Sequence, residues 1–254
     1  MTASDLTVDQ FRSRATHAAL FLDFDGVLAP IVDDPAAARP SPGAVEVLSR
    51  LVSRLGLVAV VSGRPLSFLT DHLAPEGLVL SGLYGLERVT SDEQWQHPQA
   101  GVWRETINDV AARAEAHGPA GMTVERKGAS LTLHYRTAPA IAAEVAGCAS
   151  SLAARSGLVM RDAKMSVELH PPIEVDKGST LLEMVGDHDP VAMIGDDLGD
   201  VAAFAALDML AAAGRGVLRI VVRNDETPPQ LLSRADLVLD DPGRVVELLD
   251  SLAG

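Results

Sequence analysis

The sequence predicts an α/β protein with a doubly wound parallel β-sheet and a second, α+β domain inserted into it. Short apolar runs alternate with helical patterns over roughly the first hundred residues and again after residue 172. Between these regions apolar and polar residues alternate, which is typical of half-exposed antiparallel strands. We therefore expect residues 1–100 and 173–254 to form a core around a parallel sheet, and residues 101–172 to form the inserted domain.

The first part of the predicted core contains three strands and one helix. Its short apolar runs end in polar residues or glycine and predict buried strands, at residues 17–22, 57–61 and 79–82. Between the first two runs, apolar residues recur at a spacing that places them on one helix face: Val45, Leu48, Val52 and Leu55. We predict a helix over residues 41–55, with Pro42 near its start, where a helix accepts proline.

The predicted insertion combines two alternating strands with one helix. Residues 130–135 and 165–169 alternate apolar and polar side chains, whereas residues 138–155 are rich in alanine and predict a helix. One face of this sheet is therefore expected to be available for contact.

The alternation of strands and helices returns in the C-terminal part. Residues 179–185 predict a helix, and three further apolar runs predict buried strands, at residues 191–194, 218–222 and 236–239. Helical stretches follow the last two strands. This order is typical of a parallel sheet with crossover helices.

Composition places the chain among globular proteins and excludes several classes. Apolar residues make up 47%, more than in a disordered chain, and no apolar run approaches the ~20 residues of a membrane-spanning helix. Lys and Arg number 21 against 35 Asp and Glu, and this net charge of −14 argues against nucleic-acid or anionic-membrane partners. The N-terminus lacks the apolar segment of a signal peptide. Because Cys148 is the only cysteine, we expect no internal disulfide and a cytoplasmic setting; the oligomeric state stays open, and a monomer is compatible with the sequence.

Polar clusters follow the predicted core strands where each strand ends. They are Asp23-Phe24-Asp25-Gly26, Ser62-Gly63-Arg64 and Gly195-Asp196-Asp197, and Lys177 stands just before a predicted helix. In open α/β sheets the ligand site lies beyond the carboxyl ends of the strands. We therefore expect these groups to converge.

The two aspartates after the first strand suit phosphoryl transfer. Asp23 and Asp25 are two residues apart, which places both side chains on one face of a strand. Two close carboxylates repel each other unless a cation lies between them, and Mg²⁺ prefers such oxygen ligands together with a substrate phosphate. We predict Asp23, Asp25 and Asp196 as Mg²⁺ ligands. Asp23 would be the nucleophile, and Asp25 would exchange protons with the leaving oxygen and with water.

The remaining groups suit binding of the phosphoryl oxygens. Ser62, the backbone N–H groups beside Gly63, and Lys177 can donate to them, and we predict Arg64 as a further substrate ligand. Each motif alone has a simpler explanation: a turn, a solvated helix start or an N-cap. Asp-X-Asp-Gly also lacks the ligand spacing of an EF-hand. The four motifs in this order favour one reactive site.

In this order the motifs resemble the haloacid dehalogenase-like phosphatase superfamily. This resemblance implies a Rossmann-like core, an aspartyl nucleophile and Mg²⁺. Only 36 residues separate Asp25 from Ser62, whereas 114 separate Ser62 from Lys177. The insertion therefore follows the second motif, as in members with a C2-type cap domain.

Over nearly its full length the chain resembles the trehalose-6-phosphate phosphatase family. The matching segments are DFDGVLAPIV (23–32), VSGRP (61–65), GLYGLER (82–88), VERKGASLTLHYR (124–136), KMSVELHPP (164–172), DKG (176–178) and GDDLGD (195–200). The resemblance implies hydrolysis of a phosphoric monoester, trehalose 6-phosphate. It also implies that cap residues bind the sugar: Glu125, Lys127, Arg136, Lys164 and Glu168. From the residues alone, a solvated charged face of the cap sheet is the better explanation of these five side chains.

The sequence departs from the family pattern at several positions. Val27 stands where Thr is usual, Tyr84 where His is common, and Leu198-Gly199-Asp200-Val201 lacks the usual Thr and a later acid. These departures concern the choice of substrate more than the reaction. Two alternatives stay open. The enzyme would act on another glycosyl phosphate, such as glucosylglycerol phosphate or mannosyl-3-phosphoglycerate, or the protein would be a non-catalytic sugar-phosphate sensor.

Overall fold

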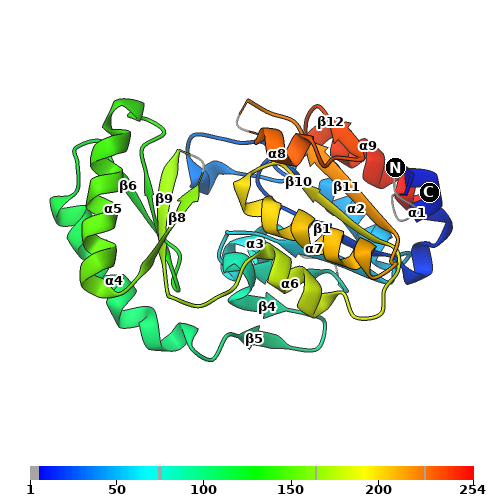
Figure 1. The fold of residues 1–254 in the computed structure, drawn as a ribbon, viewed down its shortest axis with the longest axis horizontal. Coiled ribbons are helices and arrows are strands. Elements are labelled where there is room, and N and C mark those ends of the chain that lie inside the picture. Colours follow the sequence, from blue (N-terminus) through cyan, green and yellow to red (C-terminus); the bar gives the residue numbers. More distant parts are fainter. Residues whose placement is uncertain (1–5, 74–75, 164, 226) are drawn as a thin grey trace. The chain divides into compact units, whose positions relative to one another are not determined.

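A computed structural model describes residues 6–73, 76–163, 165–225 and 227–254. The chain folds into two compact units (Figure 1). The core unit comprises Met1–Trp95 and Val175–Gly254, and the inserted unit comprises Gln96–Glu174.

The core unit is built on an eight-stranded sheet that is mostly parallel. Its strands, in spatial order, are β12 (Leu237–Leu239), β11 (Val217–Val222), β10 (Val191–Gly195), β1 (Ala19–Leu22), β2 (Leu57–Val61), β3 (Val79–Gly82), β4 (Glu87–Val89) and β5 (Gln94–Gln96). The strands from β12 to β3 pair in parallel, and β4 pairs antiparallel with β3. This topology confirms the predicted α/β fold with its parallel sheet.

Helices cover both faces of the core sheet. One face packs against α1 (Val8–Ser13), α2 (Ala44–Val52), α3 (Leu66–His72) and α9 (Pro242–Ala253), and the other against α6 (Lys177–Met184), α7 (Val201–Ala212) and α8 (Pro229–Leu232). Along β1, Leu20 and Leu22 enter the first layer, whereas Ala19 and Phe21 enter the second. Because both faces are buried, the parallel strands are continuous apolar runs rather than alternating ones.

The helix expected at residues 41–55 is shorter than predicted. Residue Gly43, with a φ of 84°, precedes α2, so Pro42 lies outside the helix. The buried face carries Ala44, Val47, Leu48 and Leu51, whereas Val45 and Val52 lie at its margin. The predicted apolar face and the observed buried face overlap at Leu48. The observed face is rotated so that it includes the small Ala44.

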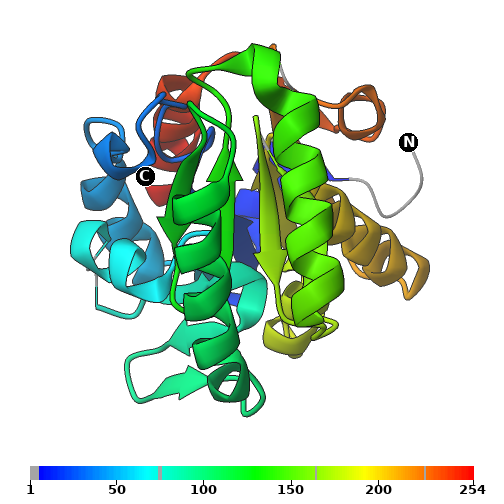
Figure 2. The same cartoon turned by 90° about the vertical axis from the view of Figure 1, so that its left-hand side faces the viewer.

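The inserted unit is a four-stranded antiparallel sheet with two helices on one face. The strand order is β6 (Thr123–Arg126), β7 (Leu131–His134), β9 (Ser166–His170) and β8 (Val159–Ala163). Helices α4 (Arg104–His117) and α5 (Ala142–Ser156) lie side by side on this sheet (Figure 2). The predicted strands at 130–135 and 165–169 and the helix at 138–155 are present; β6, β8 and α4 were not predicted.

Short 3₁₀ segments connect several elements, at Ala15–His17, Pro35–Ala37, Leu83–Gly85, Ala100–Trp103, Pro139–Ile141 and Leu198–Asp200. No helix within the described ranges is long and apolar enough to cross a bilayer.

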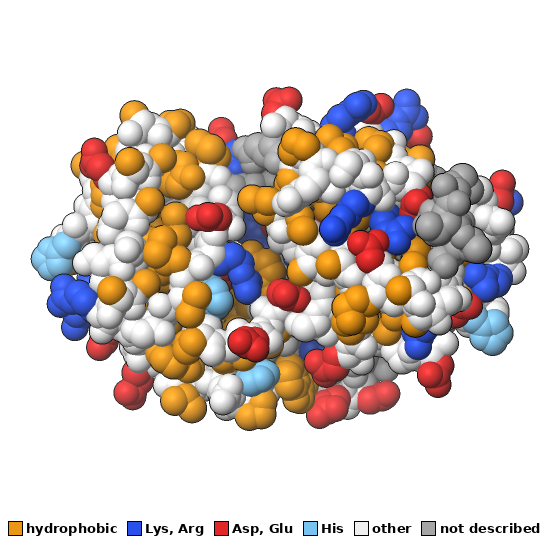
Figure 3. Space-filling model, in the orientation of Figure 1, with side chains coloured by type: hydrophobic (Ala, Val, Ile, Leu, Met, Phe, Trp, Pro, Cys, Tyr) orange, Lys and Arg blue, Asp and Glu red, His pale blue; other side chains and the backbone are white. Residues whose placement is uncertain are grey.

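The acidic surface is partly balanced by exposed ion pairs. Arg223 lies 2.6 Å from Asp240, and Arg244 lies 2.6 Å from Glu247. Figure 3 shows Lys and Arg side chains interspersed with Asp and Glu on the visible face of the core unit. Exposed pairs contribute only about 0–1 kcal/mol each, so the apolar layers on the sheet dominate the stability of the core.

Candidate active site at the carboxyl end of the core sheet

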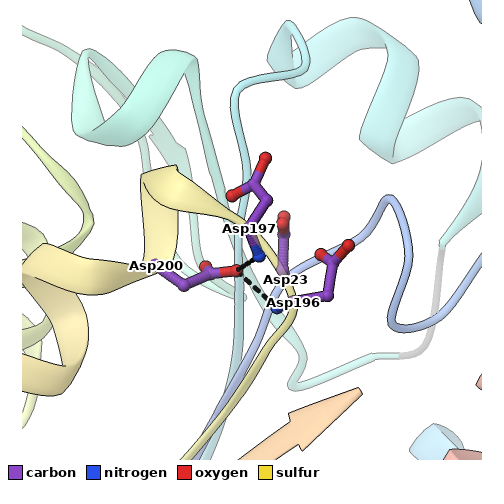
Figure 4. A group of neighbouring side chains, drawn as sticks. All are labelled: Asp23, Asp196, Asp197 and Asp200. Atoms are coloured by element: carbon purple, nitrogen blue, oxygen red, sulfur yellow. Dashed lines mark hydrogen bonds between the residues drawn. The ribbon is translucent and has the colours of Figure 1, made fainter. Parts of the chain in front are cut away.

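The structure gathers four aspartates beyond the carboxyl ends of two neighbouring strands. Asp23 directly follows β1, and Asp196 and Asp197 directly follow the adjacent strand β10. Because Leu22 is in register with Ile194, the two strands end at the same level of the sheet. Asp200 ends the 3₁₀ turn Leu198–Asp200 and immediately precedes α7. One carboxylate oxygen of each aspartate lies within 4.8 Å of the others (Figure 4).

A buried lysine links two of these carboxylates. The Nζ of Lys177, the first residue of α6, lies 2.6 Å from Oδ2 of Asp23 and 2.7 Å from Oδ1 of Asp200. The Asp176 side chain caps α6 by accepting from the Ser179 N–H at 2.7 Å, which fixes where the helix and its lysine begin. Lys177 is 2% exposed and Asp23 is 4% exposed, so bulk water screens this pair only weakly.

Asp200 holds the loop after β10 in place. Its second oxygen, Oδ2, accepts from the backbone N–H of Asp196 at 2.8 Å and of Asp197 at 3.2 Å, as the dashed lines in Figure 4 show. Both of its oxygens are therefore committed to donors within the protein. Asp197 and Asp200 were not among the predicted metal ligands, although both lie in the matching segment GDDLGD (195–200).

The electrostatics of this group favour a cation. Burial raises the pKa of Asp23 well above its ordinary value, and Lys177 opposes the further rise caused by the neighbouring aspartates. Burial also lowers the pKa of Lys177, but the carboxylates of Asp200 and Asp23 outweigh it and hold this pKa well above its usual range. One ammonium thus faces four carboxylates. The donor set consists of oxygen only, which suits a hard divalent cation.

Asn224 is a further member of the site that was not predicted from the sequence. It lies two residues beyond β11, and its Nδ2 donates to Oδ2 of Asp196 at 2.8 Å. The sequence could have indicated this residue, because Asn224 follows the carboxyl end of the strand predicted at residues 218–222. This amide fixes the orientation of one carboxylate in the cluster.

The carboxylate of Asp25 lies on an arginine and outside the group of four aspartates. Arg64 Nε donates to Oδ2 of Asp25 at 2.7 Å, and Nη2 donates to Oδ1 at 2.8 Å. The guanidinium also donates to the Pro35 carbonyl at 2.7 Å and lies 4.5 Å above the Phe68 ring. Asp25, predicted as a Mg²⁺ ligand, and Arg64, predicted as a substrate ligand, therefore form an ion pair with each other.

Gly26 gives the turn after these aspartates its shape. Its φ is 78°, in the left-handed region, and a Cβ at this position would collide with the carboxylate of Asp196. The first motif thus packs directly against the motif after β10.

Ser62 and Gly63 lie beside Tyr84 at the end of β2. Ser62 is buried, and its Oγ accepts from the Arg64 N–H at 3.2 Å. A Cβ on Gly63 would come within 2.7 Å of the Tyr84 hydroxyl, and one on Gly199 would lie 3.5 Å from the same ring. Two departures from the family pattern, Tyr84 and Gly199, are therefore neighbours in space.

Tyr84 keeps an uncommon backbone conformation. Its φ is 60°, next to Leu83 at 51°. The Tyr84 N–H donates to Ser62 O at 2.9 Å, and Thr180 Oγ1 donates to Tyr84 O at 2.8 Å. These bonds tie the strained turn to the loop after β2 and to α6.

The sugar-binding residues predicted in the insertion lie partly on one sheet face. Glu125 on β6 pairs with His134 at 2.8 Å, and Lys127 Nζ lies 3.9 Å from Glu168 Oε2. Arg136 follows β7 and is half-buried. Lys164 lies outside the described residues.

Comparisons with known proteins identify the family. The model of the trehalose-phosphatase family matches residues 21–242. The chain belongs to the trehalose-phosphatase family. The match covers both units of the chain and confirms the resemblance inferred from the motifs.

Curated relatives with names from the same family support this assignment. The trehalose-phosphate phosphatases of Mycobacterium tuberculosis (strain H37Rv) and Mycobacterium avium are each 34% identical, over 94% and 93% of this chain. The chain spans 62% of the length of these curated relatives.

Solved structures show the same fold. The C-terminal domain of C. albicans trehalose-6-phosphate phosphatase is 25% identical, with a TM-score of 0.79, over 98% of this chain and 97% of that one. A haloacid dehalogenase-like hydrolase from Bacteroides thetaiotaomicron, 17% identical with a TM-score of 0.60 over 92% of this chain and 99% of that one, shares the fold.

Proposed function

We propose that this protein is a Mg²⁺-dependent phosphatase that hydrolyses trehalose 6-phosphate to trehalose and phosphate. One observation carries the proposal: in a chain of the trehalose-phosphatase family, a buried Lys177 lies between Asp23 and Asp200 at the carboxyl end of the core sheet. A buried aspartate held by a lysine, in a group of oxygen ligands, is suited to attack phosphorus.

Asp23 and Asp196 are the side chains proposed to hold Mg²⁺. Both oxygens of Asp200 accept hydrogen bonds from protein groups, and Arg64 holds the carboxylate of Asp25, so these two side chains have other roles. When bound, Mg²⁺ would reduce the repulsion between the carboxylates and the phosphate and orient the phosphoryl group.

The chemistry divides into two displacements on Asp23. A carboxylate oxygen of Asp23 attacks phosphorus, the bond from phosphorus to the sugar oxygen breaks, and Asp25 gives its proton to that oxygen. A water then attacks the aspartyl-phosphate, loses a proton to Asp25 and releases phosphate from Asp23. Ser62, the N–H groups beside Gly63, and Lys177 would bind the phosphoryl oxygens throughout.

The inserted unit is proposed to act as the cap that recognises the sugar. Glu125, Lys127, Arg136, Lys164 and Glu168 would contact sugar hydroxyls, because carboxylates accept from hydroxyl groups while Lys and Arg donate to them. Covering the substrate would exclude bulk water from the reacting groups.

The test is phosphate release from a panel of sugar phosphates, with and without Mg²⁺. The panel holds trehalose 6-phosphate, glucosylglycerol phosphate, mannosyl-3-phosphoglycerate and p-nitrophenyl phosphate. The proposal expects the highest kcat/KM for trehalose 6-phosphate and no turnover after chelation. A higher kcat/KM on another glycosyl phosphate would change the substrate and keep the reaction. Binding of trehalose 6-phosphate without phosphate release would favour the sensor.

A further inference from the structure

The sheet of the inserted unit has a polar face opposite its helices. Leu131 and Leu133 on β7 pack toward α4 and α5, so the alternate residue Thr132 lies on the other face. In the register of the sheet, Thr132 is flanked by Glu125 on β6 and by Glu168 on β9. We call this face, which carries Glu125, Lys127, Ser130, Thr132, His134 and Glu168, the polar sheet face.

Three buried polar atoms of the polar sheet face lack a hydrogen-bond partner among the residues that the structure describes. They are Ser130 Oγ, Thr132 Oγ1 and Glu168 Oε2, and their residues are 1%, 2% and 1% exposed. Lys127 Nζ lies 3.9 Å from Glu168 Oε2, too far for a hydrogen bond. Buried polar groups in native proteins are almost always paired, so three such atoms on one face indicate a partner that the protein itself does not supply.

The chemistry of these atoms defines that partner. The carboxylate oxygen needs a donor, whereas each hydroxyl can donate or accept. An apolar group would leave these polar atoms unpaired. A neutral group that carries several hydroxyls satisfies all three atoms.

We propose that Thr132 and Ser130 are further sugar-contacting residues, whose hydroxyls, together with Glu168 Oε2, bind hydroxyl groups of the substrate. This inference rests on the proposed function, because it takes a glycosyl phosphate as the substrate. Thr132 lies between Glu125 and Glu168 in the register of the sheet, so its hydroxyl can contact the same sugar as these carboxylates.

The decisive variant is Thr132→Val, which removes the hydroxyl and keeps the shape of the side chain. For the best glycosyl phosphate of the panel we expect kcat/KM to fall about tenfold, since one hydrogen bond is lost and the sugar hydroxyl is left unpaired. Hydrolysis of p-nitrophenyl phosphate should stay within about twofold, because it presents no sugar. Thr132→Ser should restore most of the loss on the sugar substrate.

Thr70→Val is the matched control. Thr70 is exposed on α3 of the core unit, so the same substitution there should change the kinetics on neither substrate. Ser130→Ala provides a second test if Thr132→Val fails to fold, as circular dichroism would show. Calorimetric titration with the unphosphorylated sugar adds a readout that is independent of turnover, and both variants should bind it more weakly.

The outcomes separate this inference from the proposed function. If the wild-type protein hydrolyses a glycosyl phosphate and Thr132→Val and Ser130→Ala retain its kcat/KM, only the inference is wrong. Equal losses on the sugar substrate and on p-nitrophenyl phosphate would also overturn it, because they indicate a structural role. A wild-type protein inactive on every glycosyl phosphate would overturn both.

Discussion

The aspartate group of the core unit and the polar sheet face of the inserted unit differ in how closely their charged side chains are paired: Lys177 Nζ lies 2.6 Å from Asp23, whereas Lys127 Nζ lies 3.9 Å from Glu168. In the core unit, Lys177 lies between Asp23 and Asp200, and Arg64 holds Asp25. On the polar sheet face, Thr132 and Glu168 bury oxygens that no described residue meets. Groups that must stabilise charge during a reaction are effective when they are held in place beforehand. Groups that only recognise a ligand can leave their hydrogen bonds to the ligand itself.

The largest expected effect tests the aspartate group of the core unit. Asp23→Asn should lower kcat at least about 10³-fold on every phosphate ester, because the amide cannot attack phosphorus. Thermal unfolding should show that the fold is retained, since the side chains have nearly the same shape. Asp187→Asn, at an exposed position, is the control. Near-normal turnover in Asp23→Asn would remove this residue as the nucleophile.

The next effect tests whether recognition is confined to the inserted unit. Glu168→Gln should lower kcat/KM for the sugar phosphate roughly 10²-fold, because a buried carboxylate is a stronger acceptor than an amide. Hydrolysis of p-nitrophenyl phosphate should hardly change. Steady-state kinetics on both substrates measure the difference, with Glu115→Gln at an exposed position of α4 as the control. A parallel fall on both would show that Glu168 serves the chemistry or the fold.

A smaller effect distinguishes two roles for Arg64. If Arg64 positions Asp25, Arg64→Lys should lower kcat about tenfold for the sugar ester, because lysine cannot form the two parallel bonds. p-Nitrophenolate leaves without a proton, so its ester should be affected less. If Arg64 instead binds substrate, as the sequence predicted, KM should rise for both esters. Arg88→Lys, at a partly exposed ion pair, is the control.

The smallest effect concerns the orientation of Asp196. Asn224→Ala should weaken Mg²⁺ binding by a few fold, because partners that orient a metal ligand commonly contribute to affinity. Calorimetric titration with Mg²⁺ measures this directly, and chelation should lower the Tm of the wild-type protein more than that of the variant. Unchanged Mg²⁺ affinity in Asn224→Ala would show that this amide has no part in the metal site.

Local patterns predicted the core strands well. The apolar runs at 57–61 and 79–82 match β2 and β3, because strands buried on both faces are apolar throughout. The four motifs lay at strand or helix ends, and the parallel sheet brings Asp23, Lys177 and Asp196 together. This part of the site needed only topology and spacing.

Other features could not be predicted because they depend on pairing between distant residues. Helix α4 has a weak apolar stripe, so its periodicity gave no signal before packing. The bond between Arg64 and Asp25 joins residues 39 apart, and Asp25 was expected beside a cation shared with Asp23. Spacing along one strand states which face a side chain occupies, but not which partner it meets.

The ring of Tyr84 has a consequence for engineering. Since it leaves no room for a Cβ on Gly63, any side chain introduced there demands a smaller residue at position 84. Gly199, in the loop after β10, is less restricted, because a Cβ there would lie 3.5 Å from the Tyr84 ring. A library that varies one of these three positions alone would sample mostly collisions or voids, so attempts to alter this site should randomise them jointly.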